Sequence, residues 1–308
     1  MKKVLALVLA AAMAFSMVAC GGNKTATSGA AEGTATGSSN ITVQLGPNPE
    51  TLDPALNSAI DGANLILTTF EGLLIIDENN EVQPGQAESW EVSEDGLTWT
   101  VTIRDDVKFT DGEPLTASDV AFTYNTVKAE STVNDFTMLD SAEAVDDTTV
   151  VFHMNRPYST WPYSMAVVGI VPEHAYGPDY GQNPIGSGRY ILKQWDKGQQ
   201  VILEANPDYY GEEVKMKKVV ILFMSEDAAF AAAKAGQVDV AYTAASYTDQ
   251  TIDGFDLLAV KTVDNRGINL PAVAEENGIG NDFTADVRVR QALCYAVDKQ
   301  QIIDLAFD

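Results

Sequence analysis

The chain has 308 residues, of which 44 are acidic and 19 are basic, so its formal net charge at pH 7 is −25. A surface this negative repels phosphate backbones, and nucleic acid is therefore not an expected partner. The roughly 268 residues that follow position 40 exceed what one small hydrophobic core organises, which favours a fold of two lobes.

The first 40 residues have the composition of a leader followed by a tether. Met1–Lys3 is positively charged, and residues 4–19 are uncharged and mostly apolar. This run is shorter than the roughly 20 residues of a membrane-spanning helix, so residues 1–19 are predicted to be a secretory signal peptide. Residues 21–40 contain no large apolar side chain, which predicts a flexible tether.

Cys20 directly follows the predicted cleavage site. The site resembles a bacterial lipobox, with Met17 in place of the usual Leu, and this resemblance implies that Cys20 is lipidated. The alternative is an ordinary signal peptide followed by a cysteine without a role. Cys294 is the second of two cysteines, so lipidation of Cys20 would leave it unpaired, and no disulfide is expected.

The first predicted strand of the mature chain is residues 41–45, where Ile41, Val43 and Leu45 alternate with polar residues. A Thr-Leu-Asp-Pro motif follows at residues 51–54. A mostly apolar segment at residues 65–76 is followed by Gln83-Pro84-Gly85.

Residues 86–125 predict two hairpin turns and a capped helix in succession. Residues 97–103 alternate between apolar residues and threonines, and Asp95-Gly96 suits a tight turn back to a partner strand at residues 90–92. A second Asp-Gly pair follows at residues 111–112. Thr116 and Asp119 then have the spacing of a capping box, with apolar residues on one face of the helix that it opens.

Further hairpins and a βαβ unit are predicted downstream. Residues 142–154 form a second alternating pair of strands around an Asp-Asp turn, and a Gly-Ser-Gly turn leads into a strand at Tyr190. Residues 219–240 predict a strand, an alanine-rich helix and a second strand, in which Asp239 has a structural role.

These motifs, taken together, strongly resemble extracellular solute-binding proteins, family 5, which are the dipeptide, oligopeptide and nickel receptors of ABC importers. The resemblance extends from residue 41 to residue 308. Ser187 and Arg189 stand where the family's return crossing has Thr and Pro. The matching motifs are Thr51–Pro54, Asp95–Val120, Asn183–Tyr190, Gly236–Val240 and Asp286–Leu293.

The resemblance implies an α/β fold of two lobes, of the periplasmic-binding-protein type, class II, with a small α/β lobe inserted. Lobe I is expected from residues 41–76 and 183–265, the inserted lobe from 77–182, and the start of lobe II from 266–308. A strand is expected at 266–270. The helix at 286–293 is expected to bury its apolar face, with Cys294 packed near the edge of that face rather than reactive. The sequence ends within a predicted helix, so lobe II is expected to be incomplete.

In peptide-binding members of the family, the loop after Thr-Leu-Asp-Pro offers backbone groups to an extended ligand. The resemblance therefore implies an extracytoplasmic, monomeric, lipid-anchored receptor that passes peptides to membrane permease subunits. Receptors for a nickel chelate, haem or an oligosaccharide remain alternatives. No cofactor and no resident metal are expected. The residues implied to lie near the solute are Asn57, Ser58, Ala59, Ile60 and Asp61.

Enzymatic motifs are sparse in this sequence. It contains no Gly-x-Ser-x-Gly and no His-Glu-x-x-His, and its two histidines, His153 and His174, lie in separate segments, with His174 expected to face solvent. Paired carboxylates of a secreted carbohydrate hydrolase remain an alternative among 44 acidic residues. The chain is therefore expected not to be an enzyme.

Overall fold

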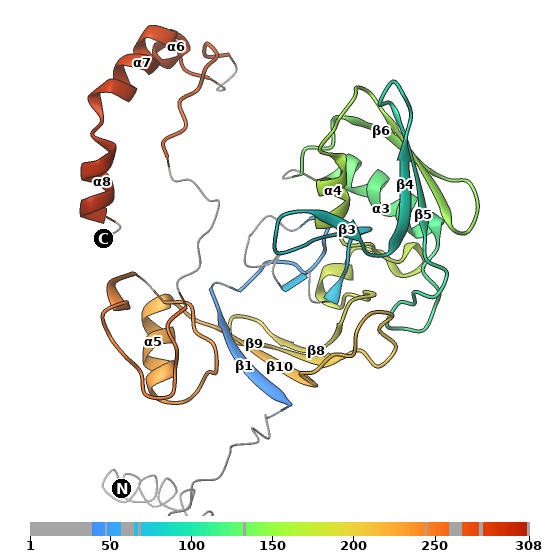
Figure 1. The fold of residues 1–308 in the computed structure, drawn as a ribbon, viewed down its shortest axis with the longest axis horizontal. Helices are drawn as coiled ribbons and strands as arrows, with labels where there is room; N and C mark the ends of the chain where they lie inside the picture. Colours follow the sequence, from blue (N-terminus) through green and yellow to red (C-terminus); the bar gives the residue numbers. More distant parts are fainter. Residues whose placement is uncertain are drawn as a thin grey trace, which may run out of the picture. The chain divides into compact units, whose positions relative to one another are not determined.

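The structure is a computed structural model of the chain (Figure 1). The predicted signal peptide, Cys20 and nearly all of the predicted tether lie outside the residues that it describes. In the described part, no helix is long and apolar enough to cross a membrane. The described residues are 39–46, 48–56, 65–66, 69–131, 134–243, 245–258, 267–276 and 280–306.

The main sheet has four strands in the order β1-β10-β9-β8. β1 pairs with β10 in parallel, whereas the other neighbours are antiparallel. One face of the sheet covers a core that contains Leu52, Phe70 and Leu203. The predicted first strand is confirmed. The strand bounds are β1 Asn40–Leu45, β8 Tyr190–Asp196, β9 Gln200–Ala205 and β10 Lys218–Phe223.

The small sheet is antiparallel and has the order β4-β5-β7-β6. β5 buries its alternate apolar residues as predicted, and Gly96 has a positive φ of 70° in the turn between β4 and β5. The predicted hairpins of β4 with β5 and of β6 with β7 are confirmed. The predicted Asp111-Gly112 turn is present with a Gly112 φ of 96°, but only one bridge, between Lys108 and Pro114, pairs its flanking residues. The strand bounds are β4 Ala87–Val92, β5 Thr98–Ile103, β6 Leu139–Ala144 and β7 Thr149–Met154.

Helix α3 (Ala117–Glu130) packs on the small sheet, as Figure 1 shows. It begins with the predicted capping box, because the Thr116 backbone N–H donates to Asp119 Oδ2 at 2.9 Å. Tyr124 of α3 meets Phe152 of β7 and Trp161 at ring-centroid distances of 4.8 and 5.6 Å. These buried aromatic side chains form the centre of the second core.

Short elements connect the two sheets. β2 (Leu74–Ile76) and β3 (Val82–Pro84) form a hairpin against which α4 (Trp161–Val167) packs. Ile185, on the segment that returns to the main sheet, contacts both hydrophobic cores. The 3-10 turns are η1 Glu173–Ala175, η2 Tyr180–Gln182 and η3 Ala245–Tyr247.

The predicted βαβ unit is only partly formed. β10 and helix α5 (Glu226–Lys234) are present, but the expected second strand is reduced to one parallel bridge between Val240 and Val43. Backbone bonds join this bridge, from the Asp239 N–H to the Thr42 carbonyl at 2.7 Å and from the Gln44 N–H to the Val240 carbonyl at 2.9 Å. The Asp239 side chain adds a further bond, because its Oδ2 accepts the Thr42 N–H at 2.7 Å. The structural role predicted for Asp239 is confirmed.

Two predictions for the last part of the chain are wrong. Residues 267–270 form no strand, because they pair with no strand among the described residues. Helix α7 (Val287–Ala296) begins at Asp286 as predicted, but none of its residues is buried and Cys294 is exposed. α7 packs against the four-residue helix α6 (Asp282–Ala285), which is too short to cover its apolar face, and α8 (Lys299–Ala306) follows it.

Candidate functional site

Three parallel segments of the main sheet end at the same edge. β1 ends at Leu45, its parallel neighbour β10 ends at Phe223, and Val240 lies on the other side of β1. In open α/β sheets, ligands bind outside the carboxyl ends of parallel strands where the chain connections diverge. We therefore take residues 44–46, 222–224 and 240–242 as the candidate ligand-binding edge and call them the carboxyl edge.

Gln44 joins the three segments of the carboxyl edge. Its side chain is buried, Nε2 donates to the Met224 carbonyl at 2.9 Å, and Oε1 accepts the Tyr242 N–H at 2.9 Å. Tyr242 follows with 67% of its surface exposed. None of the nine residues of the carboxyl edge is charged, so the edge has no side chain that would select a solute by its charge.

The loop predicted to contact the solute follows the carboxyl edge in the chain. Asn57, Ser58, Ala59, Ile60 and Asp61 all lie outside the described residues, so their role stays a prediction.

The Thr-Leu-Asp-Pro motif before that loop is described, and its contacts are structural. Asp53 is buried, accepts the Ala55 N–H at 2.8 Å and accepts the Tyr176 hydroxyl at 2.8 Å. Burial raises the pKa of the Asp53 carboxyl despite these hydrogen bonds. The Leu52 N–H donates to the Gly181 carbonyl at 3.0 Å. The motif therefore holds the start of the loop against the segment at 180–182.

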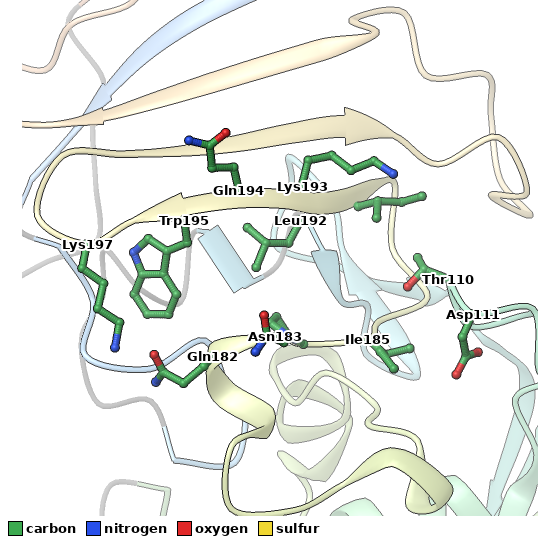
Figure 2. A pocket seen from close by; sticks show the side chains of 12 residues that line it. Thr110, Asp111, Gln182, Asn183, Ile185, Leu192, Lys193, Gln194, Trp195 and Lys197 are labelled. Atoms are coloured by element: carbon green, nitrogen blue, oxygen red, sulfur yellow. The ribbon is translucent and has the colours of Figure 1, made fainter.

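A pocket of about 490 Å³ opens beside the outer strand β8 (Figure 2). It lies between β8 and the segment at 182–185, with Thr110 and Asp111 at one end and Trp195 and Lys197 at the other. Sequence reasoning did not find this pocket, because its walls come from three separate segments.

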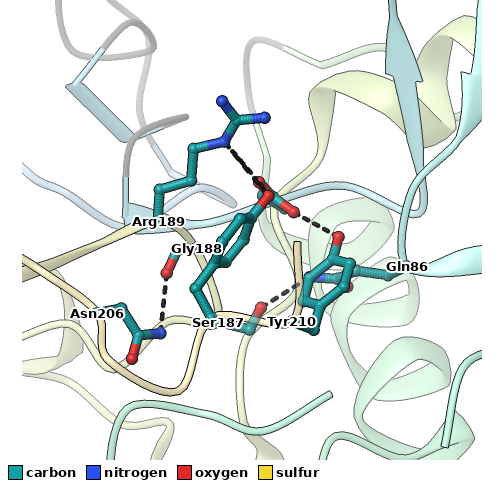
Figure 3. A network of polar contacts seen from close by, with 8 residues as sticks. Gln86, Ser187, Gly188, Arg189, Asn206 and Tyr210 are labelled. Carbon is teal, nitrogen blue, oxygen red and sulfur yellow. Dashed lines mark hydrogen bonds and ion pairs between the residues drawn. The ribbon is translucent and has the colours of Figure 1, made fainter. Parts of the chain in front are cut away.

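A polar network joins the two crossings between the sheets (Figure 3). Glu71, on the outgoing crossing, is buried and accepts hydrogen bonds from the hydroxyls of Tyr209, at 2.6 Å, and Tyr210. Arg189, on the return crossing, lies 3.5 Å from the same carboxylate through Nε. Burial and the bond to Glu71 raise the pKa of Tyr209 to about 12, so the Tyr209 hydroxyl stays protonated at neutral pH and can donate this hydrogen bond.

The glycines of the return crossing are explained by close backbone approach. A Cβ atom on Gly186 would lie 2.0 Å from the Thr69 carbonyl oxygen, and one on Gly188 would lie 2.7 Å from the Thr69 carbonyl carbon. The tight turn predicted here is wrong, because the described backbone bonds of Gly186 and Gly188 go to Thr110 and Thr69 rather than closing a turn. Ser187, which stands where the family has Thr, accepts the Gln86 amide at 2.7 Å.

Titratable groups elsewhere form a pair rather than a metal cluster. His174 Nε2 lies 2.8 Å from Asp111 Oδ2, and this contact raises the His174 pKa. His174 is about half exposed, as expected for its position. Within the residues described, no group of three His, Cys, Asp or Glu side chains is arranged to hold a metal ion.

The mixed α/β fold is similar to that of solved periplasmic binding proteins of class II. The family model for bacterial extracellular solute-binding proteins, family 5 Middle, matches residues 81–308. The chain therefore belongs to the bacterial extracellular solute-binding proteins, family 5, and the predicted family and fold class are confirmed.

Individual relatives agree with this membership. NikZ from Campylobacter jejuni, solved in complex with Ni(L-His), has a TM-score of 0.75 and 28% identity over 87% of this chain and 55% of its own. AppA from Bacillus subtilis, solved with a nonapeptide, has a TM-score of 0.70 and 25% identity over 86% and 55%. Protein XP55 from Streptomyces lividans is 33% identical over 87% of this chain and 50% of its own. The chain thus spans about half the length of the curated relatives it matches.

Proposed function

We propose that the intact protein is the solute receptor of an ABC importer, which captures peptides outside the cell and delivers them to a membrane permease. The neutral carboxyl edge is the observation that carries this proposal. Peptides of different sequence share their main chain, so a receptor that binds them by strand addition gains from a wall without charged side chains. Family membership and the nonapeptide complex of AppA support the same solute class.

A nickel chelate is the second candidate solute. The complex of NikZ with Ni(L-His) favours it, and NikZ has a higher TM-score than AppA. A chelated ion keeps ligands from its own histidine, so such a receptor does not need a metal-binding cluster of protein side chains. Haem and oligosaccharides remain as less supported alternatives.

The finer organisation of the receptor is also a proposal. We assign residues 41–76 and 183–265 to lobe I, 77–182 to the inserted lobe and 266–308 to the start of lobe II. Closure of the two large lobes by hinge motion would bury the solute against the loop at 57–61. A lipidated Cys20 and a tether at 21–40 would hold the monomeric receptor on the outer face of the membrane near its permease.

Calorimetry of the intact protein tests the solute class. Alanine-rich peptides of three to nine residues, Ni(L-His), haem and an oligosaccharide are titrated separately, and only the peptides are expected to release saturable heat. If the protein binds Ni(L-His) and none of the peptides, the nickel chelate becomes the proposed solute in place of peptides. Mass spectrometry of the solute after long incubation should find it unchanged, whereas turnover would favour the hydrolase alternative.

A variant of Tyr242 tests whether the solute binds at the carboxyl edge. Tyr242→Ala should weaken peptide binding about tenfold, because truncating one central aromatic contact costs roughly 1–2 kcal/mol. Tyr163→Ala is the matched control, since Tyr163 is also exposed but lies on α4. Equal losses in the two variants would show that the solute does not bind at this edge.

A further inference from the structure

The pocket lies beside β8, the outer strand of the main sheet, which β10 and β9 separate from β1. β8 runs in the same direction as β10, so the Trp195 end of the pocket lies next to the carboxyl edge, where the Phe223 N–H donates to the Gln199 carbonyl at 2.9 Å. The lining residues of the pocket are nevertheless different from the nine residues of the carboxyl edge. A volume of about 490 Å³ is within the usual range for a site that binds a small molecule.

Trp195 provides an aromatic wall whose orientation is held by the protein itself. Its indole Nε1–H donates to Asn48 Oδ1 at 2.9 Å, and the same oxygen accepts the Gly198 N–H at 3.0 Å. The polar atom of the ring is therefore satisfied without a ligand. Leu192 and Ile185 extend the apolar part of the lining, as Figure 2 shows.

Lys197 provides a positive charge at the same end of the pocket. Its Nζ lies 5.1 Å from the centroid of the Trp195 ring. Although the chain has 44 acidic residues, no carboxylate of the described residues lies within 4.0 Å of this ammonium group. Lys193, on the same strand, instead has Glu204 at 3.8 Å. The Lys197 charge is thus available to a ligand.

Neutral hydrogen-bonding groups lie next to Lys197. Figure 2 shows the Gln182 amide near the Lys197 side chain and Asn183 beside it on the same wall. Their side chains form no hydrogen bond within the described part of the chain, whereas their backbone N–H groups bond to Asp179 and Tyr180. An ammonium group and two free amides together suit a carboxylate.

The opposite end of the pocket contains a carboxylate, and Lys193, which is paired with Glu204, extends toward the same end in Figure 2. Asp111 lies there, and its carboxylate is 2.8 Å from His174. A ligand with a second negative group would meet this carboxylate. The pocket therefore favours one acidic group at the Trp195 end and an uncharged remainder.

We propose that this pocket is a second ligand site, which binds a small aromatic monocarboxylate. The aromatic ring packs against the Trp195 indole, and the carboxylate is bound by Lys197 with the amides of Gln182 and Asn183. The site uses none of the nine residues of the carboxyl edge, although its Trp195 end lies next to that edge.

The test uses the indole N–H signal of Trp195 in NMR spectra of the intact protein, assigned by its loss in Trp195→Phe. Indole-3-acetate is titrated, with indole-3-acetamide as the uncharged analogue of the same shape. Because an exposed ion pair contributes modestly, the acid should bind roughly two- to fivefold more tightly than the amide. Lys197→Met should remove this preference, since it keeps the side-chain stem and deletes the charge.

Lys217→Met is the matched control for the change in net charge. Lys217 lies at the opposite end of the main sheet, next to the start of β10, and its ammonium group is bonded to Glu213 and Val214. This variant should bind the acid as the wild type does.

Three outcomes would overturn the proposal. The first is the absence of a saturable shift of the Trp195 signal at roughly 20 mM indole-3-acetate, a concentration above the dissociation constant of even a weak binding site. The second is equal affinity for acid and amide, and the third is displacement of indole-3-acetate by the solute identified by calorimetry. Failure to bind peptides would leave the Trp195 result unchanged, so the two proposals fail separately.

Discussion

Gly186→Ala tests whether the two crossings between the sheets are packed as tightly as the structure indicates. The added Cβ atom would lie 2.0 Å from the Thr69 carbonyl oxygen, and this neighbour is backbone that cannot rotate away. Relief of the clash requires the outgoing and return crossings to separate by roughly 1 Å or more, because carbon contacts are optimal near 3.5–4.0 Å.

The cost follows from the contacts at that point. Overpacking of a tight site costs ~1–3 kcal/mol. Two hydrogen bonds would also be strained, from Gly188 N–H to Thr69 O at 3.0 Å and from Thr110 N–H to Gly186 O at 2.8 Å. Each such bond contributes ~1 kcal/mol net, so the free energy of unfolding should fall by about 3–5 kcal/mol.

Urea denaturation of the intact protein, followed by circular dichroism, measures this change. Gly177→Ala is the matched control, because its Cβ atom would have no neighbour within 4 Å and its φ is not positive. That variant should stay within about 1 kcal/mol of the wild type. A Gly186→Ala protein as stable as Gly177→Ala would refute the close approach of the two crossings.

Three further predictions concern ionisable or reactive groups. Tyr209 has a pKa of about 12 in the folded protein, above the 10.0 of a free tyrosine, so its contribution to stability is complete below pH 10 and is lost as the pH rises to 12. Tyr209→Phe should therefore flatten the loss of stability between pH 10 and 12 in denaturant titrations. An unchanged slope would contradict the bond to Glu71. Asp111→Asn should move the His174 pKa measured by NMR down toward 6.5, and a pKa that does not move would show that the pair is not formed in solution. Cys20→Ser should shift the protein from the detergent phase to unprocessed or soluble material in cell fractionation, whereas unchanged partition would exclude the lipid anchor.

Most of the predicted fold depended on signals within ten residues of chain. The threonine alternation of β5, the Asp-Gly turns and the Thr116–Asp119 box each determine a local hydrogen-bond pattern, and all are present. α4 was not predicted, because seven residues are too few for a helical period to emerge and Pro162 lies in its first turn.

The polar network between the two crossings was less predictable, because its residues are far apart in the sequence. Glu71 meets Arg189 and Tyr209 across separations of 118 and 138 residues. The substitution of Arg for Pro at position 189 was visible in the sequence, but its partner was not. Burial of α7 was predicted from one apolar face alone, and a face is buried only where another element covers it.

The structural role of Gln44 could have been inferred from the sequence, but the alternation of apolar residues did not draw attention to it. Gln44 is a polar residue of the alternating strand β1 and the one residue of that strand that is buried, and a polar side chain is buried only when its amide is hydrogen-bonded. Here it bonds to Met224 on one side and to the Tyr242 N–H on the other.

The same two bonds explain why the third parallel strand ends after one bridge. A regular ladder beyond Val240 would pair the Tyr242 N–H with a β1 carbonyl, but the Gln44 side chain already accepts it. The chain is therefore free to turn away from β1 at Tyr242, which leaves that aromatic side chain exposed beside the strand ends. Gln44→Leu should weaken solute binding without any contact between residue 44 and the solute, because the Tyr242 N–H would lose its acceptor and the edge its fixed geometry. Gln44→Glu keeps an acceptor for that N–H but loses the donor to the Met224 carbonyl. Tighter solute binding by Gln44→Glu than by Gln44→Leu would therefore identify positioning of Tyr242, rather than packing of β1, as the function of this side chain.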